Sequence, residues 1–364
     1  MDFIQDFRDP RIAKSLLAQI KAEVSPDRKY NLMEFCGGHT HALHRYGIPN
    51  LLPANIKMIH GPGCPVCVLP ISRIDQAIYL SSQAGVIFCS YADMLRVPGS
   101  HQDSLIKAKA RGADVRMVYS IEDALDIAEK NPENKIIFFA IGFETTTPPT
   151  VVAIDIAIKK GLKNFSIFCN HVLTPIAMEA ILSEEVKIDG FLGPSHVSVV
   201  IGSDAYHDVT EKYNKPMVVA GFEPLDVLQS ILMLVKMINN DKIGVENQYT
   251  RAVTPTGNVL AQQLVSKYLE IRESFEWRGL GFIPNSALKI KDEYLELDVE
   301  CIYTLPEVEG LEHKQCACPD ILRGLKEPKD CKLFGVVCTP EQPMGACMVS
   351  SEGACAAHYQ YGGL

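Results

Sequence analysis

Short apolar runs alternate with amphipathic stretches between about residues 55 and 225. The runs are rich in Ile, Val and Phe and too short for helices, which predicts buried parallel strands. They occupy residues 56–60, 85–90, 114–120, 135–142, 164–170, 188–193 and 215–222. Helical patterns lie between them, at residues 121–131, 150–161 and 174–185. This alternation predicts an α/β fold with covered parallel sheets.

The predicted strands suit either one sheet or two lobes, and a weak internal similarity favours two. GFET at 142–145 and GFEP at 221–224 each follow an apolar strand and open a helix. We therefore expect two similar parallel-sheet lobes, residues 26–135 and residues 136–235, that face one another across a cleft.

The remaining segments, residues 1–25 and 236–364, are expected to form a smaller helical and Cys-rich domain. Residues 224–239 read as a helix leading out of the second lobe, and residues 259–277 read as another helix. Beyond residue 300 the chain is rich in Gly and Pro and holds seven of the twelve cysteines. Such a segment needs something other than a large core to hold it together.

The net charge and the hydropathy of the chain indicate which partners and which cellular compartment to expect. The net charge is -9, so no basic surface for nucleic acid or an anionic membrane is expected. No apolar run approaches the roughly 18 residues of a membrane span, and the N-terminus lacks a signal-peptide pattern. A cytoplasmic location is therefore expected. Clustered cysteines in a reducing compartment indicate metal binding or redox chemistry.

Motifs with chemical potential follow the predicted strands one after another. They are FCGGHTHALH at 35–44, HGPGCPVC at 60–67, GFETTTPP at 142–149, CNHVLTP at 169–175 and GPSHVS at 193–198. Ligands of open α/β sheets bind at the carboxyl ends of the strands. We therefore expect these loops to line one cleft.

The stretch CGGHTH places Cys36 before two glycines and at a predicted helix N-terminus. There the helix dipole and free N–H groups favour a thiolate, and the glycines leave the sulfur open to a ligand. The alternative is a cysteine buried in a strand-to-helix turn, with His39 and His41 in solvent. The sequence leaves both interpretations open.

The pair in CPVC, Cys64 and Cys67, admits three interpretations. Zinc binding would need two more ligands, which Cys36 with His39 or His41 could supply. A redox dithiol needs the pair alone, and Pro65 with a following helix matches the geometry that lowers a thiol pKa. The third is an inert reduced pair. The pattern favours the dithiol.

The segment GFETTTPPT has two interpretations of equal weight. A threonine cap followed by proline is a common helix start. Alternatively, Glu144 and neighbouring hydroxyls such as Thr145 point into the cleft and suit a polar or anionic ligand.

The C-terminal cysteines favour an iron-sulfur cluster. Their only close pair is C-x-C, which fits a zinc site poorly, and a disulfide scaffold conflicts with the missing signal peptide. A cluster tolerates dispersed thiolate ligands and could organise a Gly-rich segment. These cysteines are Cys316, Cys318, Cys331, Cys338, Cys347 and Cys355, with Cys301 just before them.

CGGHTH, GPGCPVC, GFETT, PSHVS and the terminal DCKLFGVVCTPEQPMGACMVSSEGACAAHYQYG together resemble the HypD family of hydrogenase maturation proteins. The motifs extend from residue 36 to 361, nearly the whole chain. The resemblance implies two similar α/β lobes and a third domain with a [4Fe-4S] cluster. It also implies a small HypC partner that, with HypE and HypF, helps to assemble the Fe(CN)2CO unit of [NiFe]-hydrogenases.

The family's cluster spacing, C-x12-C-x6-C-x16-C, falls on Cys318, Cys331, Cys338 and Cys355. Cys316 and Cys347 are then left as non-ligands, and Pro319 departs from the small residue expected after the first ligand. Cys36 matches the cysteine implicated in holding iron. Cys64 and Cys67 match the redox pair, which resolves the CPVC question toward the dithiol.

The combined hypothesis is a cytoplasmic scaffold and redox protein, monomeric alone, rather than a turnover enzyme. His39 or His41 would orient the iron site or pass protons to it, with Glu144 and Thr145 bordering the cleft. Two rival classes are an iron-sulfur thiol-disulfide oxidoreductase and a passive metallochaperone whose CPVC pair never cycles.

Overall fold

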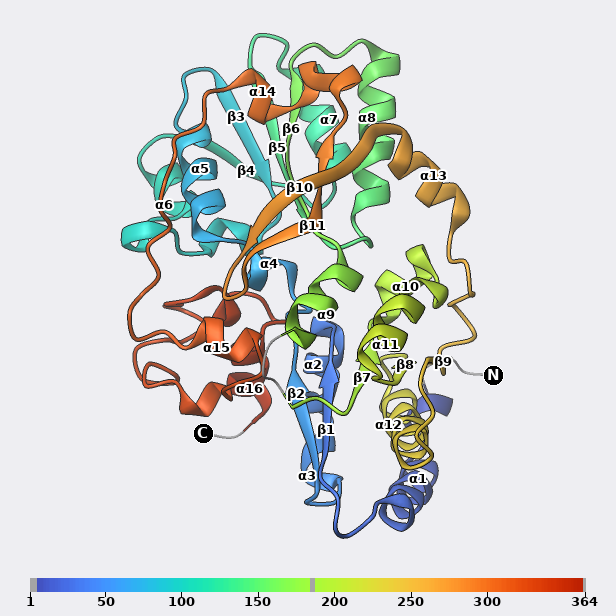
Figure 1. Cartoon of the computed structure of the whole chain (residues 1–364). Coiled ribbons are helices and arrows are strands. Elements are labelled where there is room, and N and C mark those ends of the chain that lie inside the picture. Colours follow the sequence, from blue (N-terminus) through green and yellow to red (C-terminus); the bar gives the residue numbers. More distant parts are fainter. Residues whose placement is uncertain (1–4, 184–186, 363–364) are drawn as a thin grey trace.

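Two parallel β-sheets form the frame of the computed structural model, which describes residues 5–183 and 187–362 (Figure 1). One sheet has the strand order β2-β1-β7-β8-β9 and the other the order β4-β3-β5-β6. The first contains β1 (Tyr30–Glu34), β2 (Ile56–His60), β7 (Gly190–Gly193), β8 (Met217–Val219) and β9 (Val245–Asn247). The second contains β3 (Val86–Ser90), β4 (Asp114–Met117), β5 (Lys135–Gly142) and β6 (Phe165–His171). The predicted α/β class with two parallel sheets is confirmed.

Helices connect and cover these strands. The longer ones are α1 (Pro10–Glu23), α2 (Gly37–Arg45), α5 (Ile71–Ser81), α6 (Leu105–Ala110), α7 (Ile121–Lys130), α8 (Thr147–Lys160), α9 (Thr174–Leu182), α10 (Ser195–Ile201), α11 (His207–Tyr213), α12 (Pro224–Asn239), α13 (Val259–Tyr268) and α16 (Ala354–Tyr361). Short ones are α3 (Ile48–Leu51), α4 (Pro65–Val68), α14 (Val299–Ile302), α15 (Cys318–Leu322) and the 3-10 turns η1 (Asp6–Arg8), η2 (Asp93–Arg96), η3 (Ser100–Gln102), η4 (Asp204–Tyr206), η5 (Asp292–Leu297), η6 (Pro328–Asp330) and η7 (Ala346–Met348).

Strands β3, β5 and β6 of the four-stranded sheet are buried on both faces, which explains their continuous apolar runs. In β3, Phe88 packs into a core shared with α5, whereas Ile87 and Cys89 pack into a core with α7 and α8. Every residue of β6 is buried, and in β5 only the first is not. A strand covered on both sides has no polar face, so its sequence shows no alternation.

The sheets are not divided at residue 135, the boundary expected between the lobes. Strands β1 and β2 share a sheet with the distant β7, β8 and β9, to which β1 connects by pairing with β7, while β3 and β4 join β5 and β6. The chain therefore leaves the five-stranded sheet after β2 and returns to it at β7. GFET follows β5 of one sheet, and GFEP follows β8 of the other. Helix α1 packs against α12, beside the five-stranded sheet.

The predicted helix over residues 259–277 is wrong in its second half. Helix α13 ends at Tyr268, and the chain continues as β10 (Leu269–Trp277), which pairs antiparallel with β11 (Gly281–Ile290). This hairpin contacts β6 and α9, so burial of Phe275 and Trp277 outweighs the helical pattern. Helix α9 ends at Leu182, and residues 184–185 of its predicted range lie outside the described residues.

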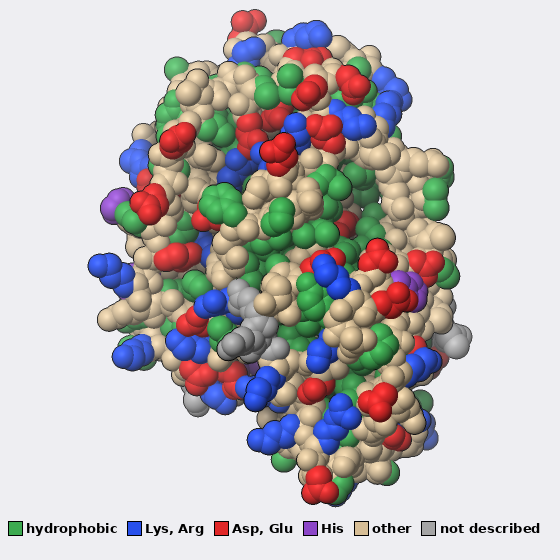
Figure 2. All heavy atoms as spheres, viewed as in Figure 1, with side chains coloured by type: hydrophobic (Ala, Val, Ile, Leu, Met, Phe, Trp, Pro, Cys, Tyr) green, Lys and Arg blue, Asp and Glu red, His purple; other side chains and the backbone are tan. Residues whose placement is uncertain are grey.

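Hydrophobic side chains gather near the middle of one face, over the hairpin (Figure 2). An apolar groove there lies between α9 and β11, and Phe282 beside it is 74% exposed. Among the described residues, no helix is both long and apolar enough to cross a bilayer.

One core joins the sheets to the Cys-rich region. It contains Met33 and Phe191 from the five-stranded sheet, Phe139 from the four-stranded sheet and Trp277 from the hairpin. It also contains Cys318 and other buried cysteines of the last 50 residues. The Cys-rich region therefore packs against the rest of the fold.

Candidate functional site

Cys36 stands at the N-cap of α2, directly after β1. Its backbone is extended, and the backbone N–H groups of Gly38 and His39 lower the pKa of its thiol, as the helix position leads one to expect. Burial outweighs them and raises the pKa, and the carboxylates of Glu352 and Glu34 act in the same direction. The free protein therefore favours a protonated Cys36 thiol.

The CPVC loop lies against the backbone of Cys36. A Cβ added at Gly63 would come within 2.3 Å of the Cys36 nitrogen and 2.5 Å of its Cα, so only glycine permits this approach. The N–H of Gly37 donates to the carbonyl of Gly63 at 3.1 Å. Cys64 and Cys67 follow at once and form a disulfide, with Cys64 as the N-cap of α4.

Glu34 fixes the other side of this loop. Its side chain is completely buried and accepts hydrogen bonds from the Cys36 N–H at 3.0 Å and from the hydroxyl of Thr40. His60 Nδ1 lies 2.8 Å from the same carboxylate, so this nitrogen carries the donated proton. A buried carboxylate with three donors is well compensated, and it ties the ends of β1 and β2 together.

His39 is held by the backbone of the loop that follows β8. Its Nε2 lies 3.1 Å from the carbonyl oxygens of both Ala220 and Gly221, and its ring packs on Phe222 with centroids 4.8 Å apart. His196 of the PSHVS motif packs on the same phenyl ring at 4.5 Å. Two of the predicted motif loops, CGGHTH and PSHVS, therefore meet at Phe222 of GFEP.

His41 points toward the Cys-rich region instead. Its Nε2 lies 3.1 Å from the hydroxyl of Tyr361 in α16, and the two rings are perpendicular. The turn before α16 also reaches the site, because a Cβ at Gly37 would meet the Glu352 side chain at 2.3 Å. The Cys-rich region and the Cys36 loop are therefore in direct contact.

Glu144 is buried and caps helix α9. It accepts hydrogen bonds from the N–H of Thr174 at 2.8 Å and from its hydroxyl at 2.7 Å. Burial raises the pKa of Glu144 to about 7, although the Thr174 bonds lower it. Thr145 is exposed. Both Glu144 and Cys36 raise the pKa of the buried Tyr206 hydroxyl, after the larger effect of its burial.

The cysteines beyond residue 315 form a connected group. The Sγ atoms of Cys318 and Cys347 are 2.7 Å apart, Cys347 also interacts with Cys355, and Cys316 interacts with Cys318. Cys338 is buried, and it is one of the groups that act on the Cys355 thiol. Cys331 is half-buried, at the edge of the group.

The chemistry of these donors fits an iron-sulfur cluster. Over residues 5–183 and 187–362, no three His, Cys, Asp or Glu side chains form a ready site for one metal ion. Sulfur is nevertheless the donor that such clusters take, and the group supplies more than the four thiols needed.

Comparison with known proteins shows which family the chain is related to. The HypD family profile, described as "Hydrogenase formation hypA family", matches residues 11–362. The chain belongs to the HypD family. It is 59% identical to "Hydrogenase maturation factor HypD" of Azotobacter vinelandii, over 100% of this chain and 97% of that protein. It is 44% identical to the protein of the same name from Escherichia coli (strain K12), over 99% and 98% of the two chains.

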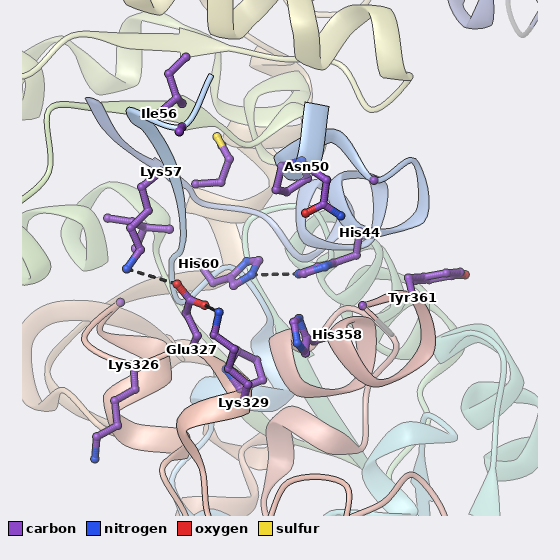
Figure 3. Close-up of a pocket in the computed structure, with 18 residues that line it drawn as sticks. His44, Asn50, Ile56, Lys57, His60, Lys326, Glu327, Lys329, His358 and Tyr361 are labelled. Atoms are coloured by element: carbon purple, nitrogen blue, oxygen red, sulfur yellow. Dashed lines mark hydrogen bonds and ion pairs between the residues drawn. The ribbon is translucent and has the colours of Figure 1, made fainter. Parts of the chain in front are cut away.

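A pocket of about 460 Å³ lies beside the HypD motifs, between β2, α2 and the Cys-rich region (Figure 3). His44 and His60 face one another in it, with their Nε2 atoms 3.1 Å apart, and His358 packs edge-on against His44. Burial, followed by His60 and His358, lowers the pKa of His44 to about 3. Through His60 and Glu34 this pocket connects to the Cys36 loop.

Sequence reasoning missed several residues that shape this HypD site. Glu34, Phe222, Tyr206 and Glu352 were not predicted, although each contacts or acts on a predicted residue. Glu34 alone carried a signal, because a carboxylate at the end of an apolar strand needs a partner when buried.

The raised pKa of Glu144 predicts a pH dependence of stability. The unfolded carboxyl loses its proton near pH 4.5 and the folded one near 7. The free energy of unfolding should therefore fall as pH rises through this interval, by up to about 3 kcal/mol. Denaturant unfolding of wild type and Glu144→Gln at several pH values measures it. The variant should lack this part of the slope, and identical slopes would contradict the assignment.

Proposed function

We propose that this chain is a maturation factor for [NiFe]-hydrogenases, a scaffold and redox protein on which the Fe(CN)2CO unit is assembled. Iron would be held at Cys36, and a [4Fe-4S] cluster would supply electrons that reduce the Cys64–Cys67 disulfide to the dithiol. The printed name of its relatives, hydrogenase maturation factor, supports the pathway. A HypC-type protein is the partner, a HypE-type protein with HypF provides cyanide, and the monomer works in the cytoplasm.

The contact between the Gly63 loop and Cys36 carries this proposal. It places a disulfide-forming pair beside the thiol that would hold iron. On its other side α4, which bears the pair, packs against η7 in the Cys-rich region. Cys64 and Cys67 also share one buried core with Cys318, Cys338 and Cys355. A relay between cluster and iron site needs this order of groups.

The cluster would be held by Cys318, Cys331, Cys338 and Cys355, and it would supply one-electron transfer. The protein itself shields the redox pair from water. Cys64 is 4% exposed and Cys67 is 1% exposed, so water is kept from the pair. As the disulfide takes two electrons and two protons, it opens to two thiols, and their reoxidation returns both.

Cys36 can supply only one thiolate ligand to the iron. Low-spin iron with CO and cyanide is soft and favours thiolate ligands. A thiolate from the HypC-type partner would therefore be the second protein ligand. His39 is pinned by two carbonyl oxygens and suits an orienting role. His41, beside Tyr361, suits proton passage toward the Cys-rich region, and Glu144 with Thr145 borders the cleft.

The dithiol should interconvert with its disulfide near cytosolic potentials, on the order of -200 to -300 mV. Alkylation at defined potentials, followed by mass spectrometry of the peptide containing Cys64 and Cys67, should show the oxidised fraction following the applied potential. Cys89, buried in β3, serves as a control thiol that should stay reduced. If both Cys64 and Cys67 remain free thiols from strongly oxidising to strongly reducing buffer, the proposed electron relay is wrong.

Iron and acid-labile sulfide content separates the proposal from its two rivals. Protein purified without oxygen together with the HypC-type partner should contain more than four irons per chain. An iron-sulfur thiol-disulfide oxidoreductase would contain four and no more. A passive metallochaperone would carry the extra iron, but its CPVC pair would not respond to potential.

A further inference from the structure

Cys347 is a buried thiol that the implied ligand set leaves over. It lies on η7 and is 1% exposed, less than Cys338 or Cys355. Its Sγ atom is 2.7 Å from that of Cys318, and its thiol also interacts with that of Cys355. A cysteine without a ligand role therefore lies between two of the proposed ligands.

Two glycines hold this arrangement together. A Cβ at Gly353 would come within 2.3 Å of the Cys347 carbonyl oxygen, so the turn before α16 can lie directly on η7. A Cβ at Gly345 would meet the sulfur of Cys316 at 2.7 Å. Backbone approaches of this kind fix the position of Cys347 relative to the other sulfurs.

We propose that Cys347 acts as a positioning residue of the cluster by donating an S–H hydrogen bond to the ligand sulfur of Cys318, thereby raising the reduction potential of the cluster. This inference rests on the proposed function and deepens it. The contact between the two sulfurs allows either one to be the donor. A Cys318 that ligates a cluster would have lost its proton, so Cys347 would then be the donor.

The effect on potential follows from charge. Reduction adds an electron to a cluster whose ligand sulfurs already carry negative charge, and a donor to those sulfurs stabilises the reduced form more than the oxidised form. The position also matters for electron transfer, because η7 packs against α4, which carries Cys64 and Cys67. Cys347 therefore lies on the element of the Cys-rich region that packs against the disulfide-forming pair.

The experiment compares wild type, Cys347→Ala and Cys347→Ser, each purified without oxygen. Iron and sulfide contents are measured first, and the midpoint potential of the cluster is then obtained by a spectroscopic redox titration. All three should hold a full cluster. The Ala variant should have a more negative potential, while the Ser variant, which keeps an O–H donor, should shift less. Cys301→Ala, at an exposed cysteine, is the matched control and should leave the potential unchanged.

Two results from the variants would overturn the inference. Equal potentials in wild type and both variants would show that no donor acts on the cluster, and loss of iron from both variants would make Cys347 a ligand. If the Ala variant does not fold, the cluster potential of the Ser variant tests the inference. An O–H donor forms a hydrogen bond of different strength from that of S–H, so the potential should still differ from that of wild type. A wild-type protein without any cluster overturns both this inference and the proposed function, whereas a normal cluster with unchanged potentials overturns this inference alone.

Discussion

The Cys36→Ser protein, purified with its HypC-type partner, should lack the infrared bands of metal-bound CO and cyanide completely. Serine keeps the size of the side chain but replaces a soft thiolate with a hard, weakly acidic hydroxyl, which binds low-spin iron poorly. The Cys-rich region should keep its [4Fe-4S] cluster, because Cys36 is outside the proposed ligand set. Infrared spectroscopy and iron analysis of the same sample measure both outcomes.

Cys301→Ser is the control for this experiment, since it changes an exposed cysteine away from the Cys36 loop. Its bands should match those of wild type. Bands of normal intensity in the Cys36→Ser protein would move the iron to another ligand, with Cys64 the next candidate because its loop touches the Cys36 backbone.

Replacing Cys331 by alanine should abolish the visible absorption of the cluster and remove all four of its irons. Cys331 is the most informative of the four ligands, because it is half-buried at the edge of the cysteine group. The energy of metal binding stabilises a segment with little core of its own, so proteolysis of the Cys-rich region should also accelerate. Visible spectra and limited digestion report the two effects.

Cys316→Ala is the matched comparison, since Cys316 interacts with Cys318 yet lies outside the implied ligand set. It should retain four irons. A full cluster in the Cys331→Ala protein would refute the ligand assignment and direct attention to Cys316 or Cys347 as the fourth ligand.

Local elements of the fold were predictable because each depends on neighbouring residues. The run KIIFFAIG coincides with β5, and PLDVLQSILMLVKMIN coincides with α12. The hairpin was not predictable from periodicity. LEIRESFEW follows a helix without a Gly or Pro to end it, and only pairing with β11 selects the extended conformation.

Long-range placement could not be derived from local patterns. Nothing in YNLME indicates that it pairs with GFLG some 160 residues later, because parallel strands carry no register signal of their own. The candidate site shows the same limit. Motif residues such as Cys36 and Glu144 were identified, but the contacts of Phe222 and Glu352 depend on loops that meet only in the folded chain.

The strands of the five-stranded sheet come from two separate parts of the chain, and this affects how the sheet can form during synthesis. Strands β3 to β6 are consecutive in the chain, so their sheet can form as soon as residue 171 has left the ribosome. Strand β1 must wait for β7 to be translated, which leaves one of its edges open in the nascent protein. We expect Cys36 and the CPVC pair to stay accessible to cellular thiols and metal ions throughout that interval, and chaperones to protect this edge.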